Sequence, residues 1–192
     1  MRKRTPEGVV SLLDRVHARK VEEIWARVEA ATGLRGVKIT PFPHFSYVVG
    51  DRLDRNVVTE GLGALARETA PFSVRVRGVA TFPTPWPTVY LRVEPEAGLR
   101  EFHRRVWEQV RPAFERPWSY YAPESWVPHV TLAHGDEPTM TPLAPSEVEA
   151  VVRLASGLRV DWTVRVDHLV TILDDRGRQV LGDRFPFEGP SP

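Results

Sequence analysis

Two short stretches of this chain each place a histidine two positions before a hydroxyl residue. Residues 43–46 read Pro-His-Phe-Ser and residues 128–131 read Pro-His-Val-Thr, and apolar residues follow both. In a β-strand, positions two apart point to the same face, so each histidine should lie beside its hydroxyl neighbour. A single pair of this kind would most simply be a histidine held inside a core. The repeated pattern instead predicts one site to which two strands each contribute an imidazole and a hydroxyl. The pairs are His44 with Ser46 and His129 with Thr131.

Two facing imidazoles suit acid–base chemistry near neutral pH, because an unperturbed histidine has a pKa of about 6.5. Displacement at phosphorus needs a base for the attacking oxygen and an acid for the leaving oxygen. The hydroxyls of Ser46 and Thr131 could donate hydrogen bonds to the phosphoryl oxygens. This chemistry needs no metal. The chain has no Gly-x-Ser-x-Gly turn, no zinc-type histidine spacing and no glycine-rich phosphate loop, so the competing chemistries are weaker.

The composition indicates a soluble, cytoplasmic protein that folds as a single domain over residues 1–192. Hydrophobic residues make up 42% of the chain, enough for a substantial core. The net charge of +1 argues against coating long nucleic acids by charge alone, yet leaves room for a small anion or an RNA end. With no cysteine, disulfides and thiolate chemistry are excluded. No signal peptide or membrane span is visible.

Strands and helices alternate in the same order in both halves of the chain. The first half reads strand (8–14), helix (15–32), the His44 strand, helix (around 58–66) and strand (72–79). The second reads strand (88–94), helix (99–110), the His129 strand, helix (146–155) and strand (158–166), then a hairpin (168–181). This order predicts an α+β fold with two duplicated lobes, about 7–80 and 81–185, related by a pseudo-two-fold axis around a central cleft. We expect the tail, 186–192, to be disordered.

The paired Pro-His-x-Ser/Thr motifs in a duplicated α/β arrangement resemble the 2H phosphoesterase superfamily. Within it, the chain is most similar to the RNA 2′,3′-cyclic phosphodiesterases, also called 2′-5′ RNA ligases, and the likeness covers almost the whole chain. The resemblance implies hydrolysis of a 2′,3′-cyclic phosphate to a 2′-phosphomonoester without a cofactor. It also implies that His129 acts as the base for water and His44 as the proton donor, with roles exchanged in the ligating direction.

Three residues depart from the family pattern. Ser46 stands where threonine is usual and keeps the hydroxyl. Tyr47 replaces a leucine and could fill the core or reach the cleft, and His134 stands near where relatives often carry arginine. Strand alternation puts His134 on the face opposite His129 unless the strand bends before Gly135. These departures affect the substrate class more than the reaction type.

A proline-rich aromatic loop, 116–128, offers candidate substrate contacts, although packing of the loop onto the body is favoured for any single ring. It contains Tyr121 and Trp126, with Trp118 and Tyr120, whose rings could stack on nucleobases. Packing is favoured for Phe82 and Trp86 in a second such stretch. Around the first motif, a solvated role is favoured for three basic residues, and His17 and His103 are expected to be exposed. The three basic residues are Arg35, Lys38 and Arg52.

The expected partners are RNA ends or cyclic nucleotides, with no membrane. Three alternatives stay open: the same chemistry on a small cyclic nucleotide or an ADP-ribose derivative, an RNA-processing exonuclease, or a binding module that does not turn over. The intact motifs argue against the last of these.

Overall fold

The computed structural model describes residues 5–34, 41–135 and 141–190. Its elements follow the order expected from the sequence, with β5 and two 3-10 helices inserted before the second histidine strand. In chain order they are β1 (Glu7–Leu12), α1 (Arg15–Thr32), β2 (His44–Leu53), α2 (Arg55–Glu68), β3 (Phe72–Phe82), β4 (Thr88–Val93), α3 (Ala97–Val110), η1 (Arg111–Ala113), β5 (Phe114–Pro117), η2 (Ser119–Tyr121), β6 (His129–His134), α4 (Pro145–Ser156), β7 (Asp161–Val166), β8 (His168–Asp175) and β9 (Arg178–Pro186).

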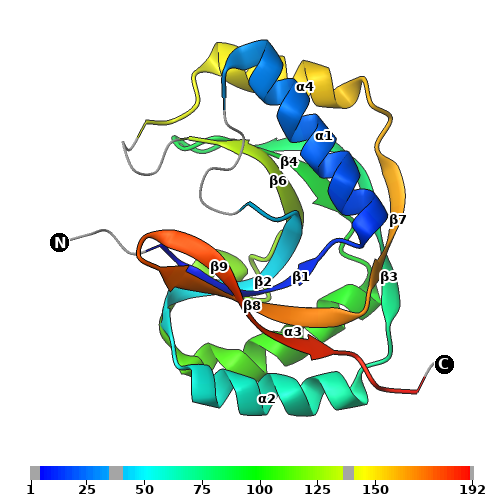
Figure 1. The fold of residues 1–192 in the computed structure, drawn as a ribbon, viewed down its shortest axis with the longest axis vertical. Coiled ribbons are helices and arrows are strands. Elements are labelled where there is room, and N and C mark those ends of the chain that lie inside the picture. The colour runs from blue at the N-terminus through cyan, green and yellow to red at the C-terminus, as the bar shows by residue number, and fades with distance from the viewer. Residues whose placement is uncertain (1–4, 35–40, 136–140, 191–192) are drawn as a thin grey trace.

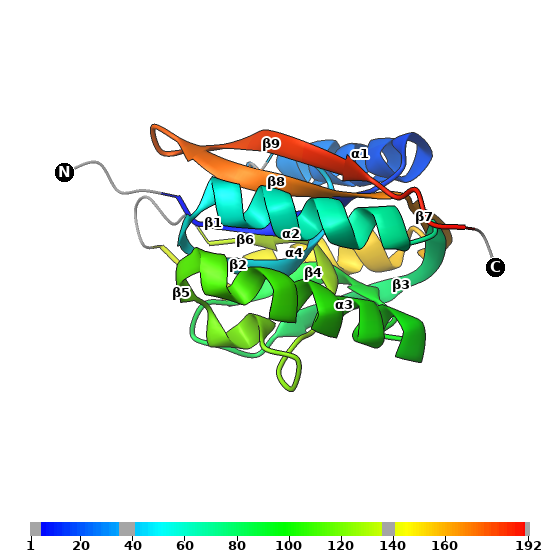
Figure 2. The same cartoon turned by 90° about the horizontal axis from the view of Figure 1, so that it is seen from below.

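The strands form two antiparallel sheets, which confirms the expected α+β fold with two lobes. One sheet has the strand order β5-β2-β1-β8-β9 and the other has the order β6-β4-β3-β7. Helices α2 and α3 pack together and cover the first sheet, whereas α1 and α4 cover the second (Figures 1 and 2). The two histidine strands, β2 and β6, come from different sheets and contact each other where the sheets meet.

The two sheets do not follow the division of the sequence at residue 80. Strand β3, from the first half, pairs with β4 and β7, while β8, from the second half, pairs with β1. Helix α1 likewise packs beside β6, and α3 packs beside β2. Each lobe is therefore assembled from both halves of the chain, which corrects the boundaries predicted for the lobes. Local patterning showed the repeat but carried no information about which strands would pair.

Local signals set the helix ends. Helix α1 begins after Asp14, whose carboxylate accepts the backbone N–H groups of Val16 and His17, and it ends at Gly33 with a φ of 73°. These are the predicted boundaries. Helix α4 instead begins at Pro145, one residue earlier than expected, and the carboxylate of Glu147 accepts the backbone N–H of Ala144 at 2.7 Å.

The described part of the tail, residues 186–190, packs on the fold, contrary to the expected disorder, and residues 191–192 lie outside the described residues. Phe187 is buried, and its backbone N–H donates to the carbonyl of Asp167 at 2.8 Å. Gly189 donates to the carbonyl of Thr69 at 2.9 Å, so close that a Cβ on Gly189 would lie 2.6 Å from the backbone of Thr69. The tail therefore closes over the end of α2.

Candidate active site

Each of the two histidines is held by a backbone carbonyl two residues before it. The Nδ1 of His44 lies 2.7 Å from the carbonyl oxygen of Phe42, and the Nδ1 of His129 lies 2.7 Å from that of Val127. Since a carbonyl can only accept, Nδ1 must carry the hydrogen in both rings. This leaves Nε2 of each neutral ring with a free lone pair. The two imidazoles thus share one tautomer and one mode of anchoring.

A β-bulge follows the hydroxyl residue in both histidine strands. In β2, Val10 pairs with Ser46 and Val9 with Val48, so Tyr47 is an extra residue. In β6, Tyr90 pairs with Thr131 and Val89 with Ala133, so Leu132 is extra. An extra residue reverses the alternation of faces beyond it. The two strands therefore share their motif and also the irregularity that follows it.

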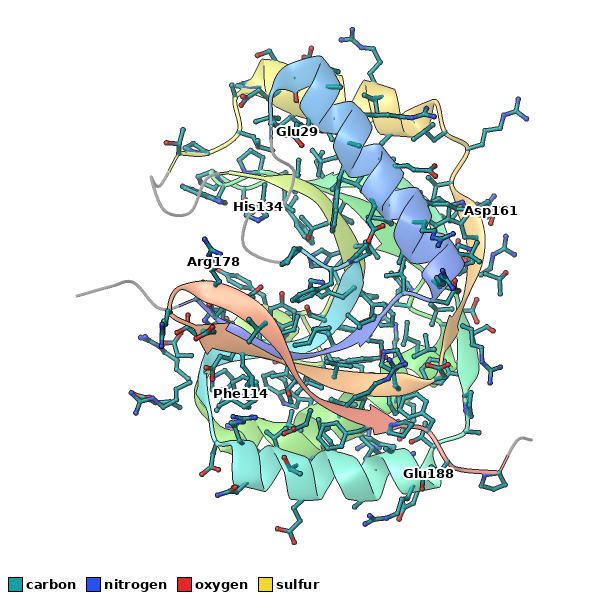
Figure 3. All side chains as sticks on the ribbon, in the orientation of Figure 1. Glu29, Phe114, His134, Asp161, Arg178 and Glu188 are labelled. Atoms are coloured by element: carbon teal, nitrogen blue, oxygen red, sulfur yellow. The ribbon has the colours of Figure 1, made fainter. Side chains whose placement is uncertain are left out.

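The bulge in β6 brings His134 to the same side as His129. Thr131 and His134 both line the central cavity even though they are an odd number of residues apart. Val49 occupies the equivalent position in β2, five residues after His44, and it lines the cavity too. The sequence did not decide whether the strand bends before Gly135, and the bulge supplies that change of direction. His134 lies at the end of β6 (Figure 3) and lines the central cavity.

Ring N–H groups hold the backbone at the two bulges. The indole Nε1 of Trp126 donates to the carbonyl of Ser46 at 2.9 Å, and that of Trp25 donates to the carbonyl of Thr131 at 3.1 Å. His103 Nε2 lies 3.0 Å from the carbonyl of Tyr47. Side chains from helices and loops thereby satisfy carbonyls where the strand pairing is irregular.

The central cavity, of about 200 Å³, lies where β2 and β6 meet. Both histidines and both hydroxyl residues line it, together with His134 and a set of aromatic rings. The aromatic rings are Trp25, Phe42, Trp86, Trp118 and Tyr121. The arrangement places two imidazoles, two hydroxyls and stacking surfaces around a space fit for a phosphate and part of a nucleoside.

Burial favours the neutral form of both imidazoles. It lowers the pKa of His44 to about 4, against the hydrogen bond to Phe42 and with a contribution from the nearby charge of His129. Burial also lowers the pKa of His129, opposed by the hydrogen bond to Val127. A positive charge on His129 therefore disfavours a second positive charge on His44.

Two of the candidate substrate contacts lie in the core instead. Tyr47 is fully buried, and its hydroxyl lies 3.0 Å from Ser11 Oγ. Strand alternation from His44 would have placed it on the core face. Trp126 is only 4% exposed and stacks on His103 with ring centroids 3.8 Å apart, so it supports the site without lining the cavity. His103 was expected to be exposed but is buried.

The aromatic residues divide between the cavity and the surface. Tyr121 and Trp118 line the cavity, although packing was favoured for either ring taken singly, while Tyr120 is 75% exposed. Trp86 lines the cavity, although packing had been favoured for it. Trp25 was missed because its helix, α1, comes from the first half of the sequence but packs beside β6, which comes from the second half. No local signal could have indicated either.

Basic residues near the first motif add little to the described site. Arg52 pairs with Glu115 at 3.7 Å on the surface, and Arg35 and Lys38 lie outside the described residues. Across the described ranges, no group of three or more metal-ligating side chains gathers as a metal site would require. Within the same ranges, no helix is long and apolar enough to cross a membrane.

Comparison with known proteins agrees with this fold. Residues 14–178 match the 2′-5′ RNA ligase superfamily. TT0787 of Thermus thermophilus has a similar structure, with a TM-score of 0.66, 18% identity, and coverage of 97% of this chain and 100% of that one. E. coli LigT complexed with NADP+ has a TM-score of 0.58 and 12% identity, with coverage of 97% of this chain and 99% of that one. E. coli LigT complexed with 3′-AMP has a TM-score of 0.55 and 13% identity, with coverage of 96% of this chain and 99% of that one.

A sequence relative, OB1230 of Oceanobacillus iheyensis, is provisionally named a phosphoesterase. It is 28% identical over 94 residues, which are 47% of this chain and 51% of that protein, so this chain spans about half the length of the relative. Two anchored histidines in a duplicated α+β fold define the 2H phosphoesterase class. The chain belongs to the 2′-5′ RNA ligase superfamily.

Proposed function

We propose that this protein hydrolyses 2′,3′-cyclic phosphate ends of RNA or related nucleotides to 2′-phosphomonoesters. The observation that carries the proposal is the matched anchoring of His44 and His129, whose Nδ1 atoms each lie 2.7 Å from a carbonyl. Both rings therefore offer Nε2 for proton transfer at one cavity. Complexes of LigT with 3′-AMP and NADP+ support a nucleotide as the substrate.

In the proposed reaction, His129 Nε2 takes a proton from a water molecule as the water oxygen bonds to phosphorus. The bond between phosphorus and O3′ breaks, and protonated His44 delivers its proton from Nε2 to O3′. The products are a 2′-phosphate and a 3′-hydroxyl, with one water consumed. In the reverse, ligating direction the two histidines exchange roles.

Two features of the cavity would favour this reaction. The hydroxyls of Ser46 and Thr131 lie on the cavity wall and can donate to the non-bridging oxygens as charge builds on them. The anionic substrate itself raises the pKa of a nearby imidazole, so on binding His44 can take a proton from solvent and hold it for the leaving oxygen. Trp118, Tyr121 and Trp86 offer faces on which a base can stack.

The decisive experiment is hydrolysis of a 2′,3′-cyclic-phosphate oligoribonucleotide in EDTA. Native protein should yield the 2′-phosphate, and His44→Ala and His129→Ala should each lose about a hundredfold or more in kcat. His17→Ala is a matched control, since His17 contacts Asp14 at the start of α1 and lies outside the cavity. Robust turnover in either cavity variant would refute the two-histidine mechanism. Binding without turnover by the native protein would favour a binding module.

A further inference from the structure

A second groove adjoins the catalytic strand on the side of His129. Three arginines, Arg77, Arg92 and Arg100, line this space of about 460 Å³, together with Glu94 and the segment Trp126–Pro128. We call it the arginine groove. With three guanidinium groups against one carboxylate, it carries net positive charge.

The arginine groove continues the same face of the sheet that carries the catalytic histidine. Tyr90 pairs with Thr131 and Arg92 pairs with His129 across β4 and β6. Directly opposed residues of antiparallel strands share a face, so Arg92 stands next to His129. The carbonyl of Val127, which anchors His129, belongs to a residue that lines the groove. An RNA chain whose end lies at His129 could therefore continue along the strand into the groove.

The backbone beneath the groove is shaped to hold Arg92. Strand β3 has a bulge between Val76 and Val79, and Gly78 there has a φ of 68°. A Cβ on Gly78 would come within 3.3 Å of the Arg92 guanidinium, and Arg92 Nε donates to the carbonyl of Arg77 at 3.3 Å. The guanidinium thus lies over a glycine, held by one of its five N–H groups.

The groove arginines keep most of their donors available. Arg100 Nε donates to the carbonyl of Pro95 at 3.0 Å, and neither Arg92 nor Arg100 forms an ion pair with any described residue. Arg77 approaches Glu94 only at 3.9 Å. Arg104, on the same helix as Arg100, is by contrast held by both Glu101 and Glu108 at 2.6 Å. Unpaired guanidinium forks are suited to bidentate contacts with phosphate.

We propose that the arginine groove binds the phosphodiester backbone of an RNA chain whose cyclic end occupies the central cavity. The inference rests on the proposed function and deepens it: the preferred substrate is an oligonucleotide, contacted on the 5′ side of its terminal nucleotide. Exposed apolar surface in the groove, from Val127 at 44% exposure, can pack against sugars or bases.

Direct binding tests this proposal independently of turnover. The probe is a fluorescent octaribonucleotide ending in a 2′-O-methyl, 3′-phosphate nucleotide, which cannot cyclise, and its anisotropy is followed against NaCl concentration. Arg92→Gln with Arg100→Gln should weaken binding at least tenfold and reduce the slope of log K against log [NaCl] by about 1.4, or about 0.7 for each lost contact. Arg104→Gln is the matched control from the exposed face of α3. If the Arg92 substitution impairs folding, the same binding measurement is made on Arg100→Gln alone.

Kinetics provide the second measurement. The ratio of kcat/KM for a cyclic-ended octanucleotide to that for a cyclic mononucleotide should fall about tenfold or more in the double variant. If its affinity and salt slope equal those of Arg104→Gln, or if native protein does not bind the probe at low salt, the groove proposal is overturned. If native protein binds the probe through these arginines but hydrolyses no cyclic phosphate, the groove proposal stands and the proposed function fails.

Discussion

Trp126 donates its indole N–H to the backbone carbonyl of Ser46 across 2.9 Å, although the two residues are 80 positions apart. Trp126 precedes His129 by three residues, and Ser46 follows His44 by two. One hydrogen bond thus connects the segment that leads into one histidine strand to the bulge of the other. This contact spans the two half-sites, whereas Trp25 holds the carbonyl of Thr131 from helix α1, which covers the same sheet as β6.

Trp126→Phe should therefore impair the geometry of the site more than its affinity for substrate. The change keeps an aromatic ring but leaves the carbonyl of Ser46 without its donor, which should cost about 1–3 kcal/mol of stability. We expect kcat to fall about tenfold with KM changed less than threefold. Trp107→Phe is the matched control, because its indole forms no hydrogen bond with the described residues. Equal kinetics in both variants would contradict a positioning role.

Tyr47→Phe should reduce stability without altering catalysis, because the structure places Tyr47 in the core. Its hydroxyl lies 3.0 Å from Ser11 Oγ, and Ser11 keeps a second bond, to the carbonyl of His168 at 2.8 Å. We expect a loss of about 1 kcal/mol in the free energy of unfolding, measured in urea. A drop in kcat/KM beyond threefold would instead place the phenol at the substrate.

His134 should tune phosphate binding. Its Nδ1 lies 2.6 Å from the carbonyl of Gly135 and must donate to it, so the neutral ring has only an acceptor, Nε2, to offer. An arginine there would present charged donors to the phosphate at every pH. We expect His134→Arg to lower KM about threefold to tenfold, and His134→Ala to change it less than threefold at pH 8. A higher KM in the arginine variant would place His134 away from the phosphate.

The pH dependence of kcat/KM should have its optimum below 6.5. One imidazole must be neutral and the other protonated, and burial lowers the pKa of both His44 and His129. The competent fraction of free enzyme therefore decreases as pH rises above these lowered values. Because bound anionic substrate raises an imidazole pKa, the kcat profile should be displaced to higher pH than that of kcat/KM. An optimum of kcat/KM above pH 7.5 would contradict this account.

Stability should decline as the pH falls from about 6.5 towards 4. Burial lowers the pKa of His103 to about 4, so between these values the unfolded chain binds the proton more readily than the folded one. This difference removes stability on acidification, on the order of 2–3 kcal/mol for a fully neutral buried ring. His103→Gln should flatten the decline in Tm between pH 6.5 and 4. An equal decline in both proteins would assign the effect to other groups.

The sequence was informative where the signal is local. Periodic apolar residues, Asp14 and Gly33 predicted α1 with its observed ends, and the repeated histidine motifs predicted two equivalent strands. Pairing between distant strands and the bulges could not be predicted, because they depend on contacts outside the local pattern. This explains why Trp25 was missed and why His134 reaches the cavity. Tyr47 is different, since strand alternation alone would have assigned it to the core.

The exchange of elements between the two halves also constrains how the chain folds as it is made. Gly8 in β1 pairs with Ile172 in β8, so one edge of β1 stays open until most of the chain has been synthesised. A contact of such long range delays closure of its sheet, which should slow folding relative to a chain with lobes built one after the other. Until β8 arrives, β1 offers an unpaired edge to other nascent chains. An active site assembled from both halves of the sequence cannot form until the second half of the chain has been synthesised.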